Sequence, residues 1–146
     1  MVESAQQIAE RAGQALFSRD RASQALGMRI VEMRPGACRV TMPVRADMLN
    51  GHRLCHGGIV FALADSAFAF ACNSYDRNTV GATASVDFLA PAREGDELQA
   101  QATELWRTGR NGIYEITVTN QRNERIALFR GRSYQLDGKV TDPPKL

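Results

Sequence analysis

The chain has 146 residues and a formal net charge of +2, with 44% hydrophobic and 23% charged residues. This size and composition fit a single domain with a core of its own. The basic residues are scattered, which argues against nucleic-acid binding, and no apolar run reaches the roughly 18 residues of a membrane span. The N-terminus lacks a signal-peptide pattern, and three widely spaced cysteines argue against a disulfide framework. We therefore expect a cytoplasmic protein without membrane or nucleic-acid partners.

The first expected element is a helix over residues 4–18. Ser4 and Gln7 have the spacing of a capping box, and apolar residues then recur at helical intervals. Two strands should follow, over residues 28–33 and 39–44, because a Pro-Gly turn separates them and apolar residues alternate with polar ones in the second. The sequence thus begins with one helix and two strands.

An irregular segment leads from these strands into an Ala-rich helix over about residues 57–73, which is apolar nearly all round. Such a pattern is typical of a helix buried on most sides. Four strands joined by short turns should follow as an antiparallel meander. They are expected over residues 79–89, 98–106, 114–119 and 126–134. The remainder, residues 137–146, is predicted to be a flexible tail.

The helix over residues 57–73 is the only element apolar enough to cover one face of this sheet. The expected architecture is therefore α+β, an antiparallel sheet wrapped round one central helix.

Asp65 is the first candidate for chemistry, because it lies in the middle of the apolar helix. A carboxylate there is costly unless it has a partner or a function. Its neighbours on the helix surface are apolar, which predicts a dry environment suited to a catalytic group. The alternative is that Asp65 belongs to a solvated stripe.

The segment His56-Gly57-Gly58 stands where this helix should begin. The first N–H groups of a helix have no partner within it, and the helix dipole adds positive character. This makes a ready oxyanion hole for a thioester carbonyl. The alternative is that the glycines only turn the chain into the helix. His52, Cys55 and His56 are too close in sequence to favour a metal site, so neither metal nor cofactor is expected.

Gly57 and Asp65 are eight residues apart, so they should lie roughly 12 Å apart along one helix. One thioester carbon cannot reach both within hydrogen-bonding distance. If both act on one substrate, they must come from two copies of the helix. A two-fold dimer would bring Gly57 of one chain near Asp65 of the other, which predicts an obligate oligomer with two sites per dimer.

Several separated motifs resemble the hotdog-fold acyl-CoA thioesterases of the phenylacetic acid degradation (PaaI) type. They are Leu49-Asn50-Gly51-His52, Cys55-His56-Gly57-Gly58, Leu63-Ala64-Asp65-Ser66-Ala67-Phe68-Ala69, Val86-Asp87-Phe88-Leu89-Ala90-Pro91 and Ala127-Leu128-Phe129-Arg130-Gly131. Their order and spacing agree over about residues 20–136. The resemblance implies one hotdog domain over residues 1–136, a sheet of five to six strands, and a homodimer that assembles into a homotetramer.

The resemblance also implies roles for single residues. Asp65 matches the catalytic carboxylate, as nucleophile or as base for water, and the backbone N–H of Gly57 matches the group that polarises the carbonyl. Asn50 matches a loop residue that positions water or the thioester, and His56 matches the histidine that orders the pocket. Residues expected to contact substrate are Ser66, Gly58, Thr83, Ser85, Arg110, Asn111 and Arg132, although the arginines are equally typical of a solvated surface.

The implied activity is hydrolysis of an aryl-acyl-CoA, such as phenylacetyl-CoA or hydroxyphenylacetyl-CoA, to free acid and CoA. Two alternatives remain open. A hotdog hydratase or dehydratase would need a histidine base, whereas both histidines here precede the helix. A noncatalytic acyl-CoA-binding protein would bind CoA esters without releasing a thiol, and the roughly 25 residues before the first strand are too few for a helix-turn-helix module.

Overall fold

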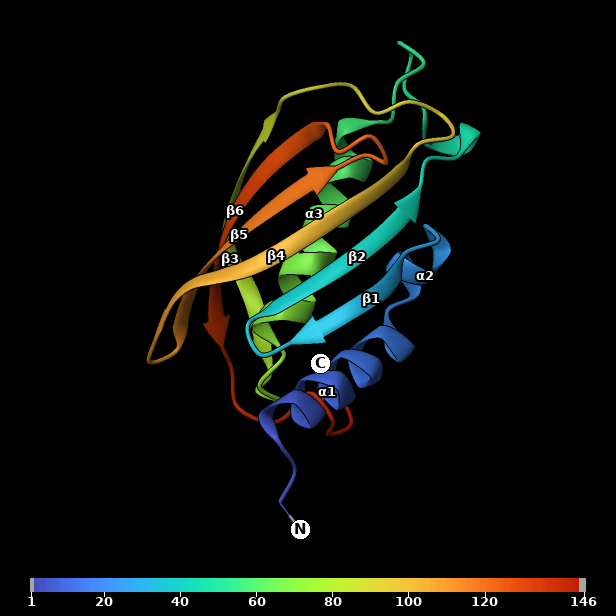
Figure 1. The fold of residues 1–146 in the computed structure, drawn as a ribbon. Helices are drawn as coiled ribbons and strands as arrows, with labels where there is room; N and C mark the ends of the chain where they lie inside the picture. The colour runs from blue at the N-terminus through green and yellow to red at the C-terminus, as the bar shows by residue number, and fades with distance from the viewer. Residues whose placement is uncertain (1, 145–146) are drawn as a thin grey trace.

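The computed structural model describes residues 2–144 of the chain. Its strands form one antiparallel sheet in the order β1-β2-β4-β5-β6-β3, and helix α3 lies across one face of that sheet (Figure 1). The strands are β1 Arg29–Arg34, β2 Ala37–Pro43, β3 Thr79–Phe88, β4 Glu97–Thr108, β5 Asn111–Thr119 and β6 Arg125–Gln135. The helices are α1 Ala5–Arg19, α2 Arg21–Ala25 and α3 Gly57–Cys72, with a 3-10 turn at Ala46–Met48. The predicted α+β architecture is confirmed.

Helix α1 begins with the predicted capping box. The Ser4 hydroxyl accepts a hydrogen bond from the Gln7 N–H (3.1 Å), and the Gln7 side chain accepts one from the Ser4 N–H (2.9 Å). The short helix α2 follows directly and was not predicted, because one turn and a half is too short to show a helical period. Its N-cap is Asp20, whose carboxylate accepts from the Ser23 N–H (2.9 Å).

Helix α3 packs its apolar side on the sheet. Phe68 sits at the centre of this contact, with its ring 5.7 Å from that of Tyr114 and 5.8 Å from that of Phe129. The opposite side of α3 is open in the single chain, and Asp65 and Gly58 are exposed there. The other residues of α3 are buried or half-buried, so the prediction of a helix buried on most sides is confirmed, with an open stripe at these two positions. No helix within residues 2–144 is long and apolar enough to cross a membrane.

The predicted four-strand meander is only partly right. Strands β4, β5 and β6 are consecutive neighbours, but β3 pairs with β6 instead of β4. Strand β4 has no free edge for β3, since it already pairs with β2 and β5. Strand β3 therefore closes the other side of β6 and becomes an edge strand of the sheet, as β1 does at the far side.

Part of the segment predicted to be a flexible tail, residues 137–146, is anchored to the domain, and residues 145–146 of that prediction lie outside the described residues. The Asn78 N–H donates to the Gly138 carbonyl (3.0 Å), and the Thr141 N–H donates to the Asp76 carboxylate (3.0 Å). Between these anchors the side chain of Val140 is buried, with 2% of its surface exposed. A buried apolar side chain and an acceptor from the α3–β3 connection thus hold residues 138–141 against the domain.

Close packing around Phe68 makes Gly131 a test of the core. A Cβ at Gly131 would lie 2.7 Å from both Cε2 and Cζ of the buried Phe68 ring. Gly131→Ala should therefore lower the free energy of unfolding by about 1–3 kcal/mol, as overpacking does elsewhere. Denaturant unfolding measures this change, with Gly51→Ala as the control because no atom lies within 4 Å of a Cβ there. Equal midpoints for the two variants would contradict this packing.

Candidate active site

The first turn of α3 leaves one backbone donor free. His56 is the N-cap, and its carbonyl accepts from the N–H groups of Ile59 (2.8 Å) and Val60 (3.1 Å). Its Nδ1 atom accepts from the Gly58 N–H (2.9 Å). The N–H of Gly57 has no acceptor among residues 2–144. The predicted oxyanion-binding donor is thus the only unsatisfied one of this turn in the described chain.

This arrangement gives His56 a structural task. Because Nδ1 accepts a hydrogen bond in the neutral ring, the proton of the imidazole lies on Nε2. The ring caps its own helix and takes up the Gly58 N–H, so Gly58 has no free N–H to offer a substrate. His56 therefore orders the helix start and directs the remaining positive end of α3 to Gly57.

Asn50 holds the loop that precedes α3. Its side-chain oxygen accepts from the N–H groups of His52 (2.9 Å) and Leu54 (3.2 Å), and its own N–H donates to the Leu54 carbonyl (2.8 Å). The side-chain NH2 of Asn50 has no acceptor among the described residues. The loop thus fixes the orientation of the amide and leaves its donor side free.

Asn50 and Gly57 line the same hollow, which has a volume of about 410 Å3. Its other walls are apolar and include Val60, Phe88, Leu89 and Ile126. Phe88 and Leu89 are unusually exposed for large apolar side chains, at 55% and 51%. A Cβ at position 57 would lie 3.3 Å from the Phe88 ring, so the glycine leaves room beside it. Two free donors in an apolar hollow can hold a carbonyl and an apolar acyl chain.

Sequence reasoning missed Phe88 and Leu89 as walls of this hollow. Phe88 ends β3 in step with its alternation, and Leu89 follows as a second consecutive apolar residue, which breaks the alternation. That break could have marked these residues as unusual in the sequence. Only the fold shows that they lie beside the start of α3.

Asp65 lies two turns further along α3 and does not line this hollow. Its carboxylate has no hydrogen-bond partner among the described residues and is open to solvent in the single chain. Even so, the surrounding side chains desolvate the carboxyl and raise its pKa, and the negative charge of Asp20 raises it further. The dry environment predicted for Asp65 is thus only half present in one chain. The separation of Gly57 from Asp65 agrees with the argument from helix length.

Ser66 is tied to the helix that the sequence did not predict. The Ser66 and Ser23 hydroxyl oxygens are 2.8 Å apart, and the Ser23 hydroxyl donates to the Asp20 carboxylate (2.6 Å). Ser23 is buried between α2 and α3, with 2% of its surface exposed. Sequence reasoning missed Asp20 and Ser23 because neither belongs to a recognisable motif.

The residues expected to bind CoA lie elsewhere in the single chain. Phe129 and Gly131 of β6 face α3, so Arg132 and its cross-strand neighbour Thr83 face away from it, as does Ser85. Arg132 donates to the Asn111 side chain (2.9 Å). Arg110 donates to the Gln135 carbonyl (2.8 Å) and to Asp137 (2.9 Å). The fold does not bring this group to Gly57 within one chain, and its role stays a prediction.

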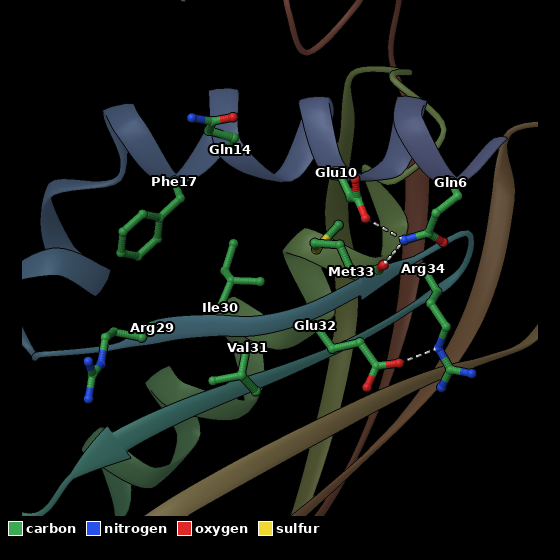
Figure 2. A pocket seen from close by; sticks show the side chains of 10 residues that line it. All are labelled: Gln6, Glu10, Gln14, Phe17, Arg29, Ile30, Val31, Glu32, Met33 and Arg34. Atoms are coloured by element: carbon green, nitrogen blue, oxygen red, sulfur yellow. Dashed lines mark hydrogen bonds and ion pairs between the residues drawn. The ribbon is translucent and has the colours of Figure 1, made fainter. Parts of the chain in front are cut away.

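A larger hollow of about 690 Å3 lies between α1 and β1 (Figure 2). The Gln6 side chain bridges it by donating to Glu10 and to the Met33 carbonyl, and Glu32 pairs with Arg34 on its floor. None of the residues expected to act on substrate lines it. Size alone therefore does not identify the site, and the smaller hollow is the one lined by residues with free donors.

The family model of the thioesterase superfamily matches residues 52–127, which include the helix start, Asp65 and most of the sheet. The chain belongs to the thioesterase superfamily. It is 44% identical over 127 residues to the acyl-coenzyme A thioesterase PaaI of Escherichia coli K12, covering 87% of this chain and 91% of that protein. A second relative, a putative esterase of Archaeoglobus fulgidus, is 36% identical over 90% of this chain and 85% of its own length.

Solved structures agree with this assignment. The structure of the E. coli PaaI protein superimposes with a TM-score of 0.92 at 42% identity, covering 93% of this chain and 99% of that one. A variant of the phenylacetic acid degradation protein PaaI of Thermus thermophilus gives a TM-score of 0.75 at 35% identity, covering 78% and 97%. The predicted hotdog fold and the resemblance to the PaaI type are confirmed, and the chain is a thioester hydrolase by family.

The raised pKa of Asp65 predicts how this residue affects stability. A carboxyl whose pKa is higher in the folded than in the unfolded state favours folding at low pH, and this gain is lost as pH rises through the folded-state pKa. Asp65→Asn has no such titration. The variant should therefore melt at a temperature equal to or above that of the wild type near neutral pH, and the difference should shrink as the pH is lowered.

Melting temperatures from about pH 4 to pH 8 measure this dependence. Asp47→Asn is a matched control in which the pKa shift has the opposite sign, because the hydrogen bond from Arg45 lowers the pKa of Asp47. A clear drop in the melting temperature of Asp65→Asn at neutral pH would show that the Asp65 carboxylate stabilises the fold, contrary to its lack of partners.

Proposed function

We propose that the protein hydrolyses acyl-CoA thioesters to a free acid and CoA, with aryl-acetyl groups as the preferred acyl part. The observation that carries the proposal is the free N–H of Gly57 in an apolar hollow, beside the free amide donor of Asn50. Hydrogen-bond donors that line one hollow are suited to the developing oxyanion of a thioester. The name of the E. coli relative, an acyl-coenzyme A thioesterase, points to the same chemistry.

The proposal requires a second copy of the chain, because Asp65 lies outside the hollow. The outer edge of β3 has no partner strand in the single chain, and residues along the strand are largely exposed. A long open edge is a ready surface for pairing with another chain. Antiparallel pairing of β3 with the partner's β3 would extend the sheet and set the two α3 helices antiparallel.

In such a dimer the two-fold axis has a defined place. If Gly57 of one subunit faces Asp65 of the partner subunit, the reverse pair must face as well. The axis then passes close to residue 61, which is halfway between them. Phe61 is half-buried there, packing on Phe129 with 5.2 Å between ring centroids, and its remaining surface is free to meet the partner. Association of two dimers into a tetramer belongs to the same proposal.

The proposed reaction begins with the thioester carbonyl accepting hydrogen bonds from the Gly57 N–H and the Asn50 amide. Asp65 of the partner subunit takes a proton from water, whose oxygen attacks the carbonyl carbon. The C–S bond then breaks, and the CoA thiolate recovers the proton. Desolvation raises the pKa of Asp65, which makes it a stronger base than an ordinary carboxylate. Direct attack by the Asp65 carboxylate is the other form of this step.

The walls of the hollow support an aromatic acyl group. The ring of Phe88 lies beside Gly57, and Val60 and Ile126 add apolar surface that a phenyl group could cover. The E. coli relative of known structure comes from the phenylacetic acid degradation operon. In this proposal the CoA moiety is held by the residues that the sequence predicted for this role. They are Thr83, Ser85, Arg110, Asn111 and Arg132.

The hydratase alternative lacks a free base in the described chain. His56 uses its Nδ1 atom to cap α3, and its ring is directed to the Gly58 N–H. His52 is exposed in the preceding loop. No histidine is therefore paired with a carboxylate at the hollow, as acid–base work on a carbon–carbon double bond requires.

Gly57→Pro tests the proposed function at its donor. Proline suits the first position of a helix, and the backbone of His56 (φ −57°, ψ 133°) already has the extended form that precedes proline. The substitution removes the N–H without removing a bond of the fold. We expect kcat for phenylacetyl-CoA, followed by release of free thiol, to fall by about 10²–10³-fold.

Gly57→Ala is the matched control, since it adds a side chain beside Phe88 but keeps the N–H. It should raise KM more than it lowers kcat. Acetyl-CoA and enoyl-CoA are assayed in parallel. A wild-type protein that releases no thiol from any acyl-CoA would refute the proposed function, and equal kcat values for Gly57→Pro and wild type would refute the role of Gly57.

A further inference from the structure

The hydrogen bonds that run from Asp20 to Ser66 have one possible direction when Asp20 is an ionised carboxylate. Such a carboxylate only accepts, so the single hydroxyl proton of Ser23 is given to Asp20 (2.6 Å). The bond between the Ser23 and Ser66 oxygens (2.8 Å) must then use the proton of Ser66. The Ser66 oxygen is left with only lone pairs for any further partner.

These hydrogen bonds, here called the Asp20–Ser23–Ser66 relay, end at Ser66 beside Asp65. Their direction therefore decides whether the Ser66 hydroxyl can accept a proton there. Ser66 follows Asp65 directly on α3 and is only half-buried, so part of this residue is open to solvent next to Asp65. Ser23 is buried, and its backbone N–H is also held by Asp20 (2.9 Å). Asp20 and Ser23, at the α1–α2 junction, therefore fix the orientation of the Ser66 hydroxyl. An attacking water has two protons, and Asp65 can take only one of them.

We propose that Asp20 and Ser23 are positioning residues of the hydrolytic site, which fix the Ser66 oxygen as acceptor for the second proton of the water that Asp65 activates. The inference rests on the proposed function and selects its water-activation form. It assigns a task to α2, which otherwise covers little of α3.

The charge of Asp20 supports this arrangement. It raises the pKa of Asp65 beyond the effect of desolvation, so it strengthens Asp65 as a base. The other titratable group coupled to Asp65 in the described chain is the Cys72 thiol, two turns further along α3. Burial raises the pKa of Cys72 to about 12, so this thiol stays neutral over the range in which Asp65 titrates.

Asp20→Asn tests the relay because it keeps the helix cap and reverses the polarity. Asparagine is an equally good N-cap and retains an oxygen for the Ser23 N–H. Its NH2 group, however, donates to the Ser23 hydroxyl, which must then donate to Ser66 and turn the Ser66 proton towards the site. We expect kcat to fall about tenfold with little change in KM, and the acid limb of the pH profile to move to lower pH.

Ser66→Ala should lower kcat to a similar extent, and adding Asp20→Asn to it should lower kcat far less than Asp20→Asn does alone, since only the effect of the Asp20 charge on the pKa of Asp65 then remains. Glu3→Gln is the charge control, because Glu3 lies before α1, roughly 22 Å from the Asp20 end of that helix. It should leave kcat and the pH profile unchanged. Melting temperatures of all variants show whether the fold is retained.

Each result has a separate meaning. Wild-type protein without thioesterase activity overturns the proposed function itself. Active wild-type protein with kcat and pH profile unchanged in a folded Asp20→Asn variant overturns the relay alone. Fully additive losses in the double variant overturn it as well, because Asp20 would then act only through its charge on Asp65 and not through Ser66.

Discussion

A single unsatisfied backbone N–H at the start of α3 is the feature on which the site depends. The carbonyl and the imidazole of His56 satisfy the other donors of the first turn, so the positive end of the helix is concentrated at Gly57. Glycine at this position leaves room beside the Phe88 ring. The fold thus builds a donor that has no use within the chain and is suited to a carbonyl oxygen.

The sheet explains why this donor and Asp65 are separate. It covers one side of α3 and buries Phe68 among aromatic rings, which fixes the helix firmly. The uncovered side carries Asp65, and the free edge of β3 is uncovered as well. Carboxylate and donor are eight residues apart on one rigid helix, so bending cannot bring them together. In the proposed dimer, pairing of two chains would satisfy both the open edge and the chemistry.

Local signals in the sequence predicted much of this structure. The Ser4 capping box, the start of α3 and the alternating strands depend on near neighbours, and all were found where expected. Asn50 and Gly57, to which the resemblance gave roles at one site, line the same hollow because one short loop joins them. The partner of β3, the wall formed by Phe88 and the contact of Ser23 with Ser66 depend on segments distant in sequence. No local pattern encodes such contacts.

The claim that two subunits share each site is tested most directly by mixing inactive chains. Asp65→Asn and Gly57→Pro chains are unfolded together and refolded as an equal mixture, with a mixture of Asp65→Asn and Asp65→Ala chains as the control. Half of the dimers should then be mixed, and each mixed dimer should hold one intact site, so about a quarter of wild-type turnover should return. A mixture as inactive as its parents would show that each site lies within one chain and would contradict the account.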